Sequence, residues 1–492
     1  MVSKEKVLRI TTSFCPKCKK ELKAEIIEEE GKIKIKKTCP SHGEFEDIYW
    51  SNSEHYKKIM AFESEPKAIT NPRTFRDKGC PYDCGICNEH KSCTILGIID
   101  VTNRCNMNCP ICFADASKSY IYEPSKEQIR EMLLNLKKNK PIPPVALQFS
   151  GGEPTLRDDL PELVEMAKSL GFSFVMVDSN GIRLAKDLSY LKALKDAGMD
   201  SIYLQFDGLD DSVYEKIRGM KMLNLKMRVL ENCRRIDFRN VVLVVTLIKG
   251  INDSQVGGII KFAVKNSDIV TCVNFQPISF AGRASKQEVR EKRITTYDFV
   301  RLVEEQTKGK IRIEDFYTIP ATAPISSFVS TLKKKEVPFL TTHPCCGVGT
   351  YIILDSKGDY KPITKLMDFE DFLSSLKRYT EEISKNNELG MISKLKIFGE
   401  ILKSVSDPER RNFLLDLLKK GDETSVRRFH KNAIMIGCMH FMDLWNFDLE
   451  RVKRCVIHYA TPDGRLIPFC SYNSFHRESV ERKFSRRGST SV

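Results

Sequence analysis

The chain has 492 residues, of which 41% are hydrophobic and 29% are charged, so it is long enough for two or three domains with a sizeable core. No apolar run reaches the length that crosses a bilayer, and the first residues, MVSKEKVLRI, do not form a signal peptide. The formal net charge of +14 favours an acidic partner, although a surface rich in Lys and Glu accounts for it equally well. The 17 cysteines gather mostly in tight clusters, which favours metal binding over disulfides.

Residues 1–50 are predicted to form a small metal-binding module. Two knuckles, CPKC and CPSHG, flank an alternating stretch, KIKIKK, that is typical of a β-hairpin. Cys15, Cys18, Cys39 and His42 supply four ligands with the spacing of a zinc ribbon or a rubredoxin. We expect one tetrahedral zinc or iron ion with a structural role, because a module of this size buries too little surface to fold without a staple.

Residues 51–94 are predicted to be a linker followed by a cluster of cysteines. A helical pattern covers residues 55–62, and prolines then break it. The cysteines have the spacing C-x3-C-x2-C-x5-C and are Cys80, Cys84, Cys87 and Cys93. The sequence predicts that these four thiolates hold a closed auxiliary [4Fe–4S] cluster, with a zinc site as the alternative.

From residue 95 to about residue 310, predicted strands alternate with predicted amphipathic helices. The strands are expected at 95–101, 145–149, 173–178, 201–206, 241–247 and 270–276. The helices are expected at 125–138, 158–170, 187–197, 211–217, 222–235 and 253–265. Six β/α units of this kind predict an α/β fold in which a parallel sheet curves into a partial TIM-like (β/α)6 barrel over 95–310. Active groups are expected at the carboxyl ends of the strands.

The first barrel strand leads into a second C-x3-C-x2-C pattern, which has no fourth cysteine nearby. Its members are Cys105, Cys109 and Cys112. Three thiolates can hold three irons of a [4Fe–4S] cube and leave the fourth iron open for a ligand. Zinc is the less suitable metal, because it takes four ligands, usually from paired cysteines. The open iron marks this loop as the predicted catalytic site.

A glycine-rich turn, SGGEPT, follows the second barrel strand. Together the cysteine triplet and this turn resemble the radical S-adenosylmethionine (SAM) superfamily. The resemblance implies that SAM binds the open iron and that an electron from the cluster yields a 5′-deoxyadenosyl radical, which takes hydrogen from unactivated carbon. The residue before the third cysteine is usually aromatic in that superfamily and is Ile111 here, so Phe113 is expected to supply the adenine contact. The other implied SAM contacts are Gly151, Gly152 and Glu153 at the methionine amine, Ser179 and Asn180 at the ribose or carboxylate, Gln205 and Asp207 at the same ligand, and Gln276 beside adenine.

Residues 311–492 lose the β/α alternation and are predicted to form a C-terminal domain. Its five cysteines lie near Pro and Gly turns. Four of them are predicted to hold a second auxiliary cluster, with buried free thiols as the alternative. The predicted ligands are Cys438, Cys455, Cys470 and one of the adjacent pair Cys345 and Cys346, of which Cys346 is favoured.

A helical pattern at 391–405 carries one apolar face, with lysines elsewhere. This pattern is consistent with a helix on a membrane surface, and also with a helix packed on a core.

The whole arrangement resembles the archaeal tetraether lipid synthases, and the tail segments HPCCGVGTYI, GCMHFMDLWNFDLERVKRCVIHYATPDGR and IPFCSYN are part of that resemblance. It implies a carbon–carbon bond-forming enzyme that couples the terminal methyl carbons of the phytanyl chains of archaeal diether lipids, giving macrocyclic or tetraether lipids. The implied partners are the diether lipid, a reductant such as ferredoxin or flavodoxin, and the membrane surface, with no nucleic acid. The implied location is cytoplasmic and peripherally membrane-associated.

Two alternatives stay open at this point. A radical SAM methyltransferase with two C-x3-C-x2-C motifs, acting on a pterin precursor, would share every SAM residue named above, but it would add mass to its substrate. A zinc-ribbon nucleic-acid-binding protein would need neither the SGGE motif nor the barrel alternation.

Overall fold

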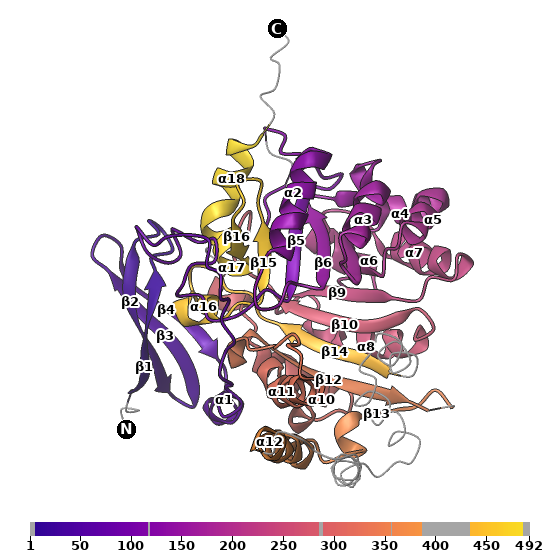
Figure 1. The fold of residues 1–492 in the computed structure, drawn as a ribbon. Coiled ribbons are helices and arrows are strands. Elements are labelled where there is room, and N and C mark those ends of the chain that lie inside the picture. The colour runs from indigo at the N-terminus through magenta and orange to yellow at the C-terminus, as the bar shows by residue number, and fades with distance from the viewer. Residues whose placement is uncertain (1–4, 117–118, 285–288, 356, 386–432, 486–492) are drawn as a thin grey trace.

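The computed structural model describes residues 5–116, 119–284, 289–355, 357–385 and 433–485 (Figure 1). A small antiparallel sheet lies on the N-terminal side, and a large, mainly parallel sheet carries most of the remaining elements. The predicted α/β barrel with a separate N-terminal module is therefore confirmed. The helical pattern at 391–405 lies outside the described residues.

The N-terminal sheet has four strands in the order β1-β2-β3-β4, and all neighbours are antiparallel. Its bounds are β1 Lys6–Phe14, β2 Glu21–Glu29, β3 Lys32–Cys39 and β4 Gly43–Trp50, followed by α1 Ser53–Met60. The two knuckles form the turns that join β1 to β2 and β3 to β4. The sequence predicted the metal ligands and a hairpin, and the structure adds a strand on each side.

Six consecutive parallel strands form the centre of the large sheet, as predicted. Their bounds are β5 Leu96–Thr102, β6 Ala146–Gly151, β7 Phe174–Ser179, β8 Ser201–Gln205, β9 Val241–Leu247 and β10 Val270–Pro277. The helices between them are α2 Lys126–Lys137, α3 Leu160–Ser169, α4 Ile182–Lys186, α5 Leu188–Asp196, α6 Asp211–Arg218, α7 Leu223–Arg235 and α8 Val256–Lys265. The short α4 was not predicted.

The chain after β10 extends this sheet at both edges. β14 pairs in parallel with β10, and β15 pairs in parallel with β5. The bounds of these later elements are α9 Val289–Lys292, α10 Thr296–Gln306, β11 Tyr317–Thr318, α11 Ala323–Lys333, β12 Gly347–Leu354, β13 Tyr360–Pro362, α12 Phe369–Lys385, β14 Ala433–Met439, α16 Leu449–Lys453, β15 Ile457–Ala460, β16 Leu466–Pro468, α17 Phe469–Ser471 and α18 Arg477–Lys483. The domain boundaries stay a prediction, and strands from both sides of residue 310 share the sheet.

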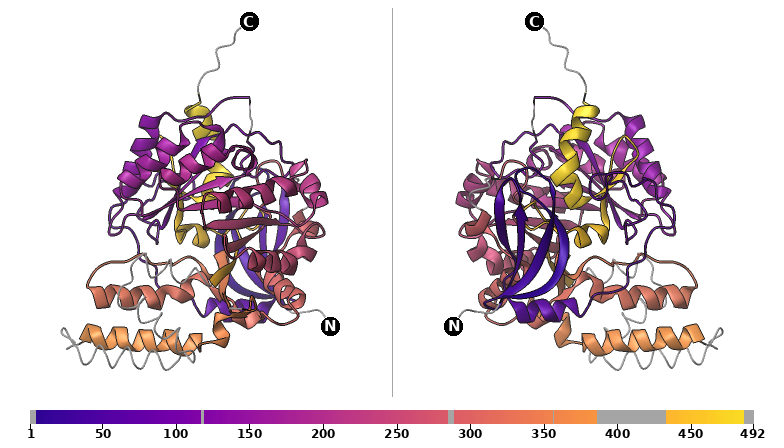
Figure 2. Two further views of the ribbon diagram at one scale, coloured as in Figure 1. Left: turned by 90° about the vertical axis from the view of Figure 1, so that its right-hand side faces the viewer. Right: turned by 90° about the vertical axis from the view of Figure 1, so that its left-hand side faces the viewer.

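The two faces of the parallel strands differ in burial. On β7, Val175 and Val177 are fully buried in the main hydrophobic core, which the helices cover. Met176 and Asp178 point to the opposite face and keep some accessible surface. Figure 2 shows the curved sheet from two sides, with the N-terminal sheet in front in its right-hand view. The face of the sheet that carries Met176 and Asp178 is called the lumen below.

Buried ion pairs attach the N-terminal sheet to the C-terminal tail. Arg293 bridges Asp47 of β4 and Asp443, and all three side chains are almost completely buried. Asp448, also fully buried, accepts hydrogen bonds from the Thr11 hydroxyl and Arg9. Removing one partner of such a pair leaves an uncompensated buried charge. The N-terminal module is thus fixed to the segment that leads into the last two cysteines.

Candidate active site and metal centres

The cysteine loop after β5 lies directly on the glycine turn after β6. The Gly152 amide donates to the Thr102 carbonyl at 2.7 Å, and the Glu153 amide donates to the Arg104 carbonyl at 2.8 Å. A Cβ added at Gly151, where φ is +143°, would come within 2.2 Å of the Thr102 oxygen, and one at Gly152 would come equally close to the Arg104 oxygen. Both glycines are therefore required for the two segments to touch.

Glu153 is the centre of the predicted SAM contacts. Its carboxylate accepts hydrogen bonds from the Ser179 hydroxyl at 2.9 Å and from the Asn180 amide at 2.7 Å. The Asn180 side chain donates to Asn106 in the cysteine loop at 2.7 Å. Burial raises the pKa of Glu153, and these hydrogen bonds act against the rise. The structure brings Glu153, Ser179 and Asn180 together at adjacent strand ends.

Cys105, Cys109 and Cys112 lie half-buried in one loop beside Glu153. Burial, together with the charges of Glu153 and the other two thiols, raises the pKa of Cys105 to about 12. A thiol in such surroundings ionises when a metal takes the place of its proton. Three closely placed thiols without a fourth cysteine fit a [4Fe–4S] cluster with one open iron.

Arg283, which was not predicted from the sequence, holds the cysteine loop in place. Its amide donates to the Cys112 carbonyl at 3.1 Å, and its guanidinium donates to the Cys109 carbonyl at 3.0 Å. A Cβ added to the preceding Gly282 would lie 2.3 Å from the Cys112 oxygen. The segment after β10 therefore covers the loop closely, and no motif spacing in the sequence announces it.

Asp207, predicted to contact SAM, is fully buried and already paired. Arg218 binds it at two points, Thr246 donates its amide to it at 3.1 Å, and the Gln205 amide also donates to it. Arg218 further hydrogen-bonds Cys109. Asp207 and Gln205 thus reach the cluster loop through Arg218, a residue that the sequence analysis did not identify.

Gln276 and Phe113 lie at different places. The Gln276 amide donates to the Tyr203 hydroxyl in the lumen at 2.7 Å. Phe113 is 37% exposed, and its ring centroid lies 5.9 Å from that of Phe469. Ile111 packs with Ile278 instead. Their contacts with adenine stay a prediction.

Three of the cysteines predicted to hold the first auxiliary cluster line a small pocket. Cys80, Cys84 and Cys87 line it together with His90, and the Cys80 and Cys84 thiols hydrogen-bond each other. Cys93, the predicted fourth ligand, does not line this pocket and packs in the main hydrophobic core. The geometry therefore brings three of the four predicted ligands together.

Of the five C-terminal cysteines, three lie near one another and two lie apart from them. Cys346 and Cys470 lie close enough to Cys455 for their charges to raise its pKa, and the charge of Cys346 also raises the pKa of Cys470. The guanidinium of buried Arg451 lies beside Cys346 and Cys470, and its Nε has no hydrogen-bond partner. Its Nη2 donates to the His440 carbonyl at 2.6 Å. A buried cation that keeps one N–H unpaired beside these two thiols fits an anionic metal cluster.

The remaining two cysteines lie elsewhere. Cys438 is fully buried in the main hydrophobic core. Cys345 packs with Tyr49 and Trp50 of the N-terminal sheet. The structure therefore favours Cys346 of the adjacent pair and separates Cys438 from its predicted partners.

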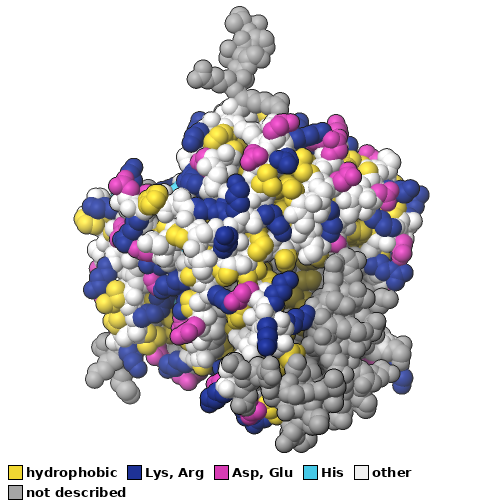
Figure 3. Space-filling model, in the orientation of Figure 1, with side chains coloured by type: hydrophobic (Ala, Val, Ile, Leu, Met, Phe, Trp, Pro, Cys, Tyr) yellow, Lys and Arg dark blue, Asp and Glu magenta, His cyan; other side chains and the backbone are white. Residues whose placement is uncertain are grey.

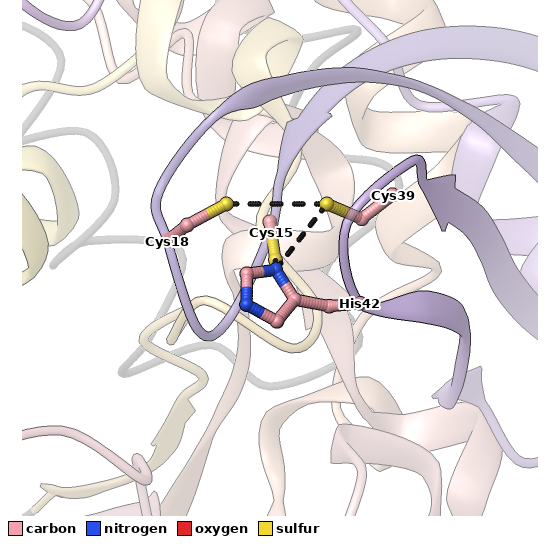
Figure 4. A group of neighbouring side chains, drawn as sticks. All are labelled: Cys15, Cys18, Cys39 and His42. Atoms are coloured by element: carbon pink, nitrogen blue, oxygen red, sulfur yellow. Dashed lines mark hydrogen bonds between the residues drawn. The ribbon is translucent and has the colours of Figure 1, made fainter.

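The N-terminal metal centre is the most compact of these groups (Figure 4). The Nδ1 atom of His42 lies 3.5 Å from the Sγ atoms of Cys15 and Cys39, and the Sγ atoms of Cys18 and Cys39 are 3.9 Å apart. Tetrahedral zinc with bonds of about 2.0–2.3 Å places its ligand atoms about 3.5–3.8 Å apart. All four ligand atoms lie within 4.8 Å of one another, so they fit one mononuclear metal ion.

The surface shows no single basic face in the view of Figure 3. Lysine and arginine side chains are spread over it and mixed with acidic ones. Among the described residues, no helix is both long and apolar enough to cross a membrane.

Comparisons with known proteins place these sites in a family. The radical SAM superfamily model matches residues 99–263, and the HMPTM N-terminal zinc ribbon domain matches residues 7–51. A Methanocaldococcus jannaschii protein named 7,8-dihydro-6-hydroxymethylpterin dimethyltransferase is 50% identical over 490 residues, covering 96% of this chain and 95% of the relative.

More distant matches cover only part of this chain. A probable GTP 3′,8-cyclase of Methanothermobacter marburgensis is 29% identical over 191 residues, covering 38% of this chain and 59% of the relative. The crystal structure of Streptococcus suis SuiB bound to SAM matches with a TM-score of 0.37 and 18% identity, covering 44% of this chain and 47% of SuiB.

The predicted membership of the tetraether lipid synthases is wrong, and so are the expected coupling of diether lipids and the diether lipid as substrate. The highly similar relative carries the name of a pterin dimethyltransferase, which is the methyltransferase alternative. The two interpretations share the doubled cysteine motif and the SAM residues, so the motifs could not separate them. The radical SAM barrel and the zinc-ribbon metal site are confirmed.

An identity of 50% that extends over both the N-terminal module and the cysteine-bearing tail exceeds what a shared barrel alone would give. The chain therefore belongs to the 7,8-dihydro-6-hydroxymethylpterin dimethyltransferase family within the radical SAM superfamily.

Proposed function

We propose that this protein is a radical SAM methyltransferase that adds methyl groups to 7,8-dihydro-6-hydroxymethylpterin. The observation that carries the proposal is the similarity to the Methanocaldococcus jannaschii enzyme over 96% of the chain. The polar side chains of Asp178, Tyr203 and Gln276 in the lumen also support it, because they suit a heteroaromatic substrate rich in hydrogen-bonding groups.

The cysteine loop and the glycine turn are proposed to bind SAM. Cys105, Cys109 and Cys112 would hold a [4Fe–4S] cluster, and Glu153 would accept a hydrogen bond from the methionine amine. Ser179 and Asn180 fix the Glu153 carboxylate in one orientation, so little freedom is lost when the ligand binds.

When bound, the cluster and SAM supply what side chains cannot, namely removal of hydrogen from an unactivated carbon and a methyl group to replace it. Each methylation replaces one C–H bond by a C–CH3 bond. It consumes a pair of SAM molecules and a pair of electrons, and leaves 5′-deoxyadenosine, methionine and S-adenosylhomocysteine. A reductant such as ferredoxin or flavodoxin would provide the electrons.

Two further metal clusters are proposed for the remaining thiol groups. One would be held by Cys80, Cys84 and Cys87 in their shared pocket. The other would be held by Cys346, Cys455 and Cys470, with Arg451 balancing its negative charge. Each group offers three thiols, so each leaves one position for a ligand other than cysteine.

An anaerobic incubation of the cluster-loaded protein with SAM, a reductant and 7,8-dihydro-6-hydroxymethylpterin tests the proposal. Mass spectrometry should show a pterin heavier by one or two CH2 units, with S-adenosylhomocysteine and 5′-deoxyadenosine formed alongside. An unchanged pterin, with 5′-deoxyadenosine still formed, would overturn the substrate and keep the radical SAM assignment.

The variant Cys105→Ala provides the matched control. It should lose 5′-deoxyadenosine formation and methylation together and keep the metal of the N-terminal site, because that site uses other ligands. Retained 5′-deoxyadenosine formation would show that the wrong cysteine triplet is assigned to SAM.

A further inference from the structure

Polar side chains of four consecutive strands form one row across the lumen. Asp100 of β5 pairs in register with Ser150 of β6, and Asp178 of β7 pairs in register with Tyr203 of β8. The Ser150 hydroxyl donates to the Asp178 carboxylate at 3.1 Å and joins the two halves. Residues in register on neighbouring strands point to the same face, so these groups lie side by side, next to the glycine turn after β6.

Asp178 is the member of this row whose charge is least compensated. Asp100, in contrast, is bound by the Arg477 guanidinium at 2.6 Å. Among the described residues, Ser150 is the only hydrogen-bond partner of the Asp178 carboxylate. Burial, together with the charges of Glu153 and Asp100, raises the pKa of Asp178 to about 7, and Arg218 acts weakly against this. A carboxylate in such a place has unused acceptor capacity directed into the lumen.

Tyr203, the neighbour of Asp178 in this row, offers a hydrogen-bond donor. Its hydroxyl oxygen accepts hydrogen bonds from the side-chain amides of both Asn274 and Gln276. Both amides come from β10, so the oxygen is held from one side. Since an oxygen that accepts two hydrogen bonds still carries its own proton, the Tyr203 O–H is left to donate to a ligand. The two neighbours thus present two acceptors and one donor in a row.

We infer that Asp178 and Tyr203 recognise the 2-amino-4-oxopyrimidine edge of the substrate, with the Asp178 carboxylate accepting from the 2-amino group and N3–H and the Tyr203 hydroxyl donating to the C4 carbonyl. The inference rests on the proposed function and names the groups that select the pterin. That edge offers two donors followed by one acceptor, which is the complement of the protein pattern. A two-point contact to a carboxylate adds geometric specificity as well as affinity.

The same edge occurs in guanine, so the experiment has to separate the two sources. Equilibrium dialysis of the cluster-loaded protein, with SAM present, would measure affinities for 7,8-dihydro-6-hydroxymethylpterin, for its lumazine analogue with a 2-oxo group, and for GTP. Wild-type protein should bind the pterin about 10- to 100-fold more tightly than the lumazine, because the analogue places a carbonyl against the carboxylate. GTP should bind more weakly than the pterin.

The variants Asp178→Asn and Tyr203→Phe test the two side chains. Asp178→Asn should weaken pterin binding about 10- to 100-fold and abolish the preference over lumazine, and Tyr203→Phe should weaken binding about tenfold. Met176→Leu, on the same face of β7, serves as the control and should leave the preference intact. SAM affinity should stay unchanged in all three variants.

The outcomes separate this inference from the proposed function. Wild-type protein that does not bind the pterin, or binds GTP more tightly, overturns the function and the inference with it. If wild-type protein binds the pterin and the lumazine equally well, the inference is wrong and the proposed function still stands. This comparison needs no variant. Unchanged discrimination in Asp178→Asn does the same, and a parallel loss of SAM affinity would assign Asp178 to SAM instead.

Discussion

Arg218 binds Asp207 at two points, with Nε 2.8 Å from Oδ2 and Nη2 2.9 Å from Oδ1. Asp207 is fully buried at the end of β8, and the same guanidinium reaches Thr246 on β9 and Cys109 in the cysteine loop. A single side chain thus joins two strand ends to the predicted cluster loop. Asp207 keeps a lowered pKa despite its burial because of this cation.

Replacement of Arg218 should therefore affect both stability and cluster loading. In Arg218→Met, buried Asp207 loses its ion-pair partner and keeps only the weaker influence of Lys226, so the free energy of unfolding should fall by about 3–5 kcal/mol. Urea unfolding under anaerobic conditions measures this, and iron analysis measures cluster loading. Arg234→Met is the control, because it breaks an exposed ion pair with Asp268 and should cost less than about 1 kcal/mol. Equal effects of the two variants would contradict the assigned role.

Gly151 should be irreplaceable for a steric reason. In Gly151→Ala the new Cβ would come within 2.2 Å of the Thr102 carbonyl oxygen, so the glycine turn must move away from the cysteine loop. We expect a loss of about 3 kcal/mol or more in the free energy of unfolding, and loss of SAM binding. Gly219→Ala shares a positive φ but meets nothing within 4 Å, so it should cost only about 1–2 kcal/mol and keep SAM binding. Normal SAM affinity in Gly151→Ala would show that the close approach is not needed.

The sequence predicted the local elements of the barrel well, because each depends on a short pattern. All six parallel strands lie within two residues of their expected ends, since buried strands read as continuous apolar runs. The strands β14 and β15, which flank the six parallel strands, were missed. Their partners, β10 and β5, are more than 150 residues away, and no regular helix–strand alternation leads to them. Pairing at such distances leaves no local pattern.

The site shows the same division between local and distant information. Glu153, Ser179 and Asn180 were predicted from motifs at strand ends, and the structure brings them together. Arg218 and Arg283 were missed, because each acts across the fold on a loop more than 100 residues away. Cys93 was assigned as a ligand from its spacing and Cys438 from the number of cysteines in the tail, and neither signal shows where a side chain points. The structure places both in the main hydrophobic core, and their roles as ligands stay a prediction.

The C-terminal thiols give a prediction about metal content. Cys346→Ser and Cys470→Ser should each lower the iron content by the same amount, since both side chains belong to one group beside Arg451. Cys438→Ser should keep the full iron content, because its side chain lies in the main core. Iron analysis after anaerobic reconstitution measures all three. If Cys438→Ser lost iron as the other two do, the separation of Cys438 from the group would be wrong.

Asp178 should make stability depend on pH in a definite direction. Its pKa is about 7 in the folded protein, against an ordinary value of 3.8, so between these values the folded state binds more protons than the unfolded state. Its contribution is therefore fully present below about pH 4 and is lost as pH rises through about 7. Between about pH 5.5 and 8, the free energy of unfolding of the wild type should fall by about 2 kcal/mol relative to Asp178→Asn.

Urea unfolding of the wild type and the variant at several pH values, under anaerobic conditions, would give this difference curve. The neighbouring groups Glu153, Asp100 and Arg218 are common to both proteins, so the difference isolates Asp178. Asp268→Asn is the control, because the pKa of Asp268 is lowered and its carboxylate stays ionised in both states over this range. A flat difference curve for Asp178→Asn would mean that the carboxylate is paired or well hydrated. Such a carboxylate would have less unused capacity for the pterin edge.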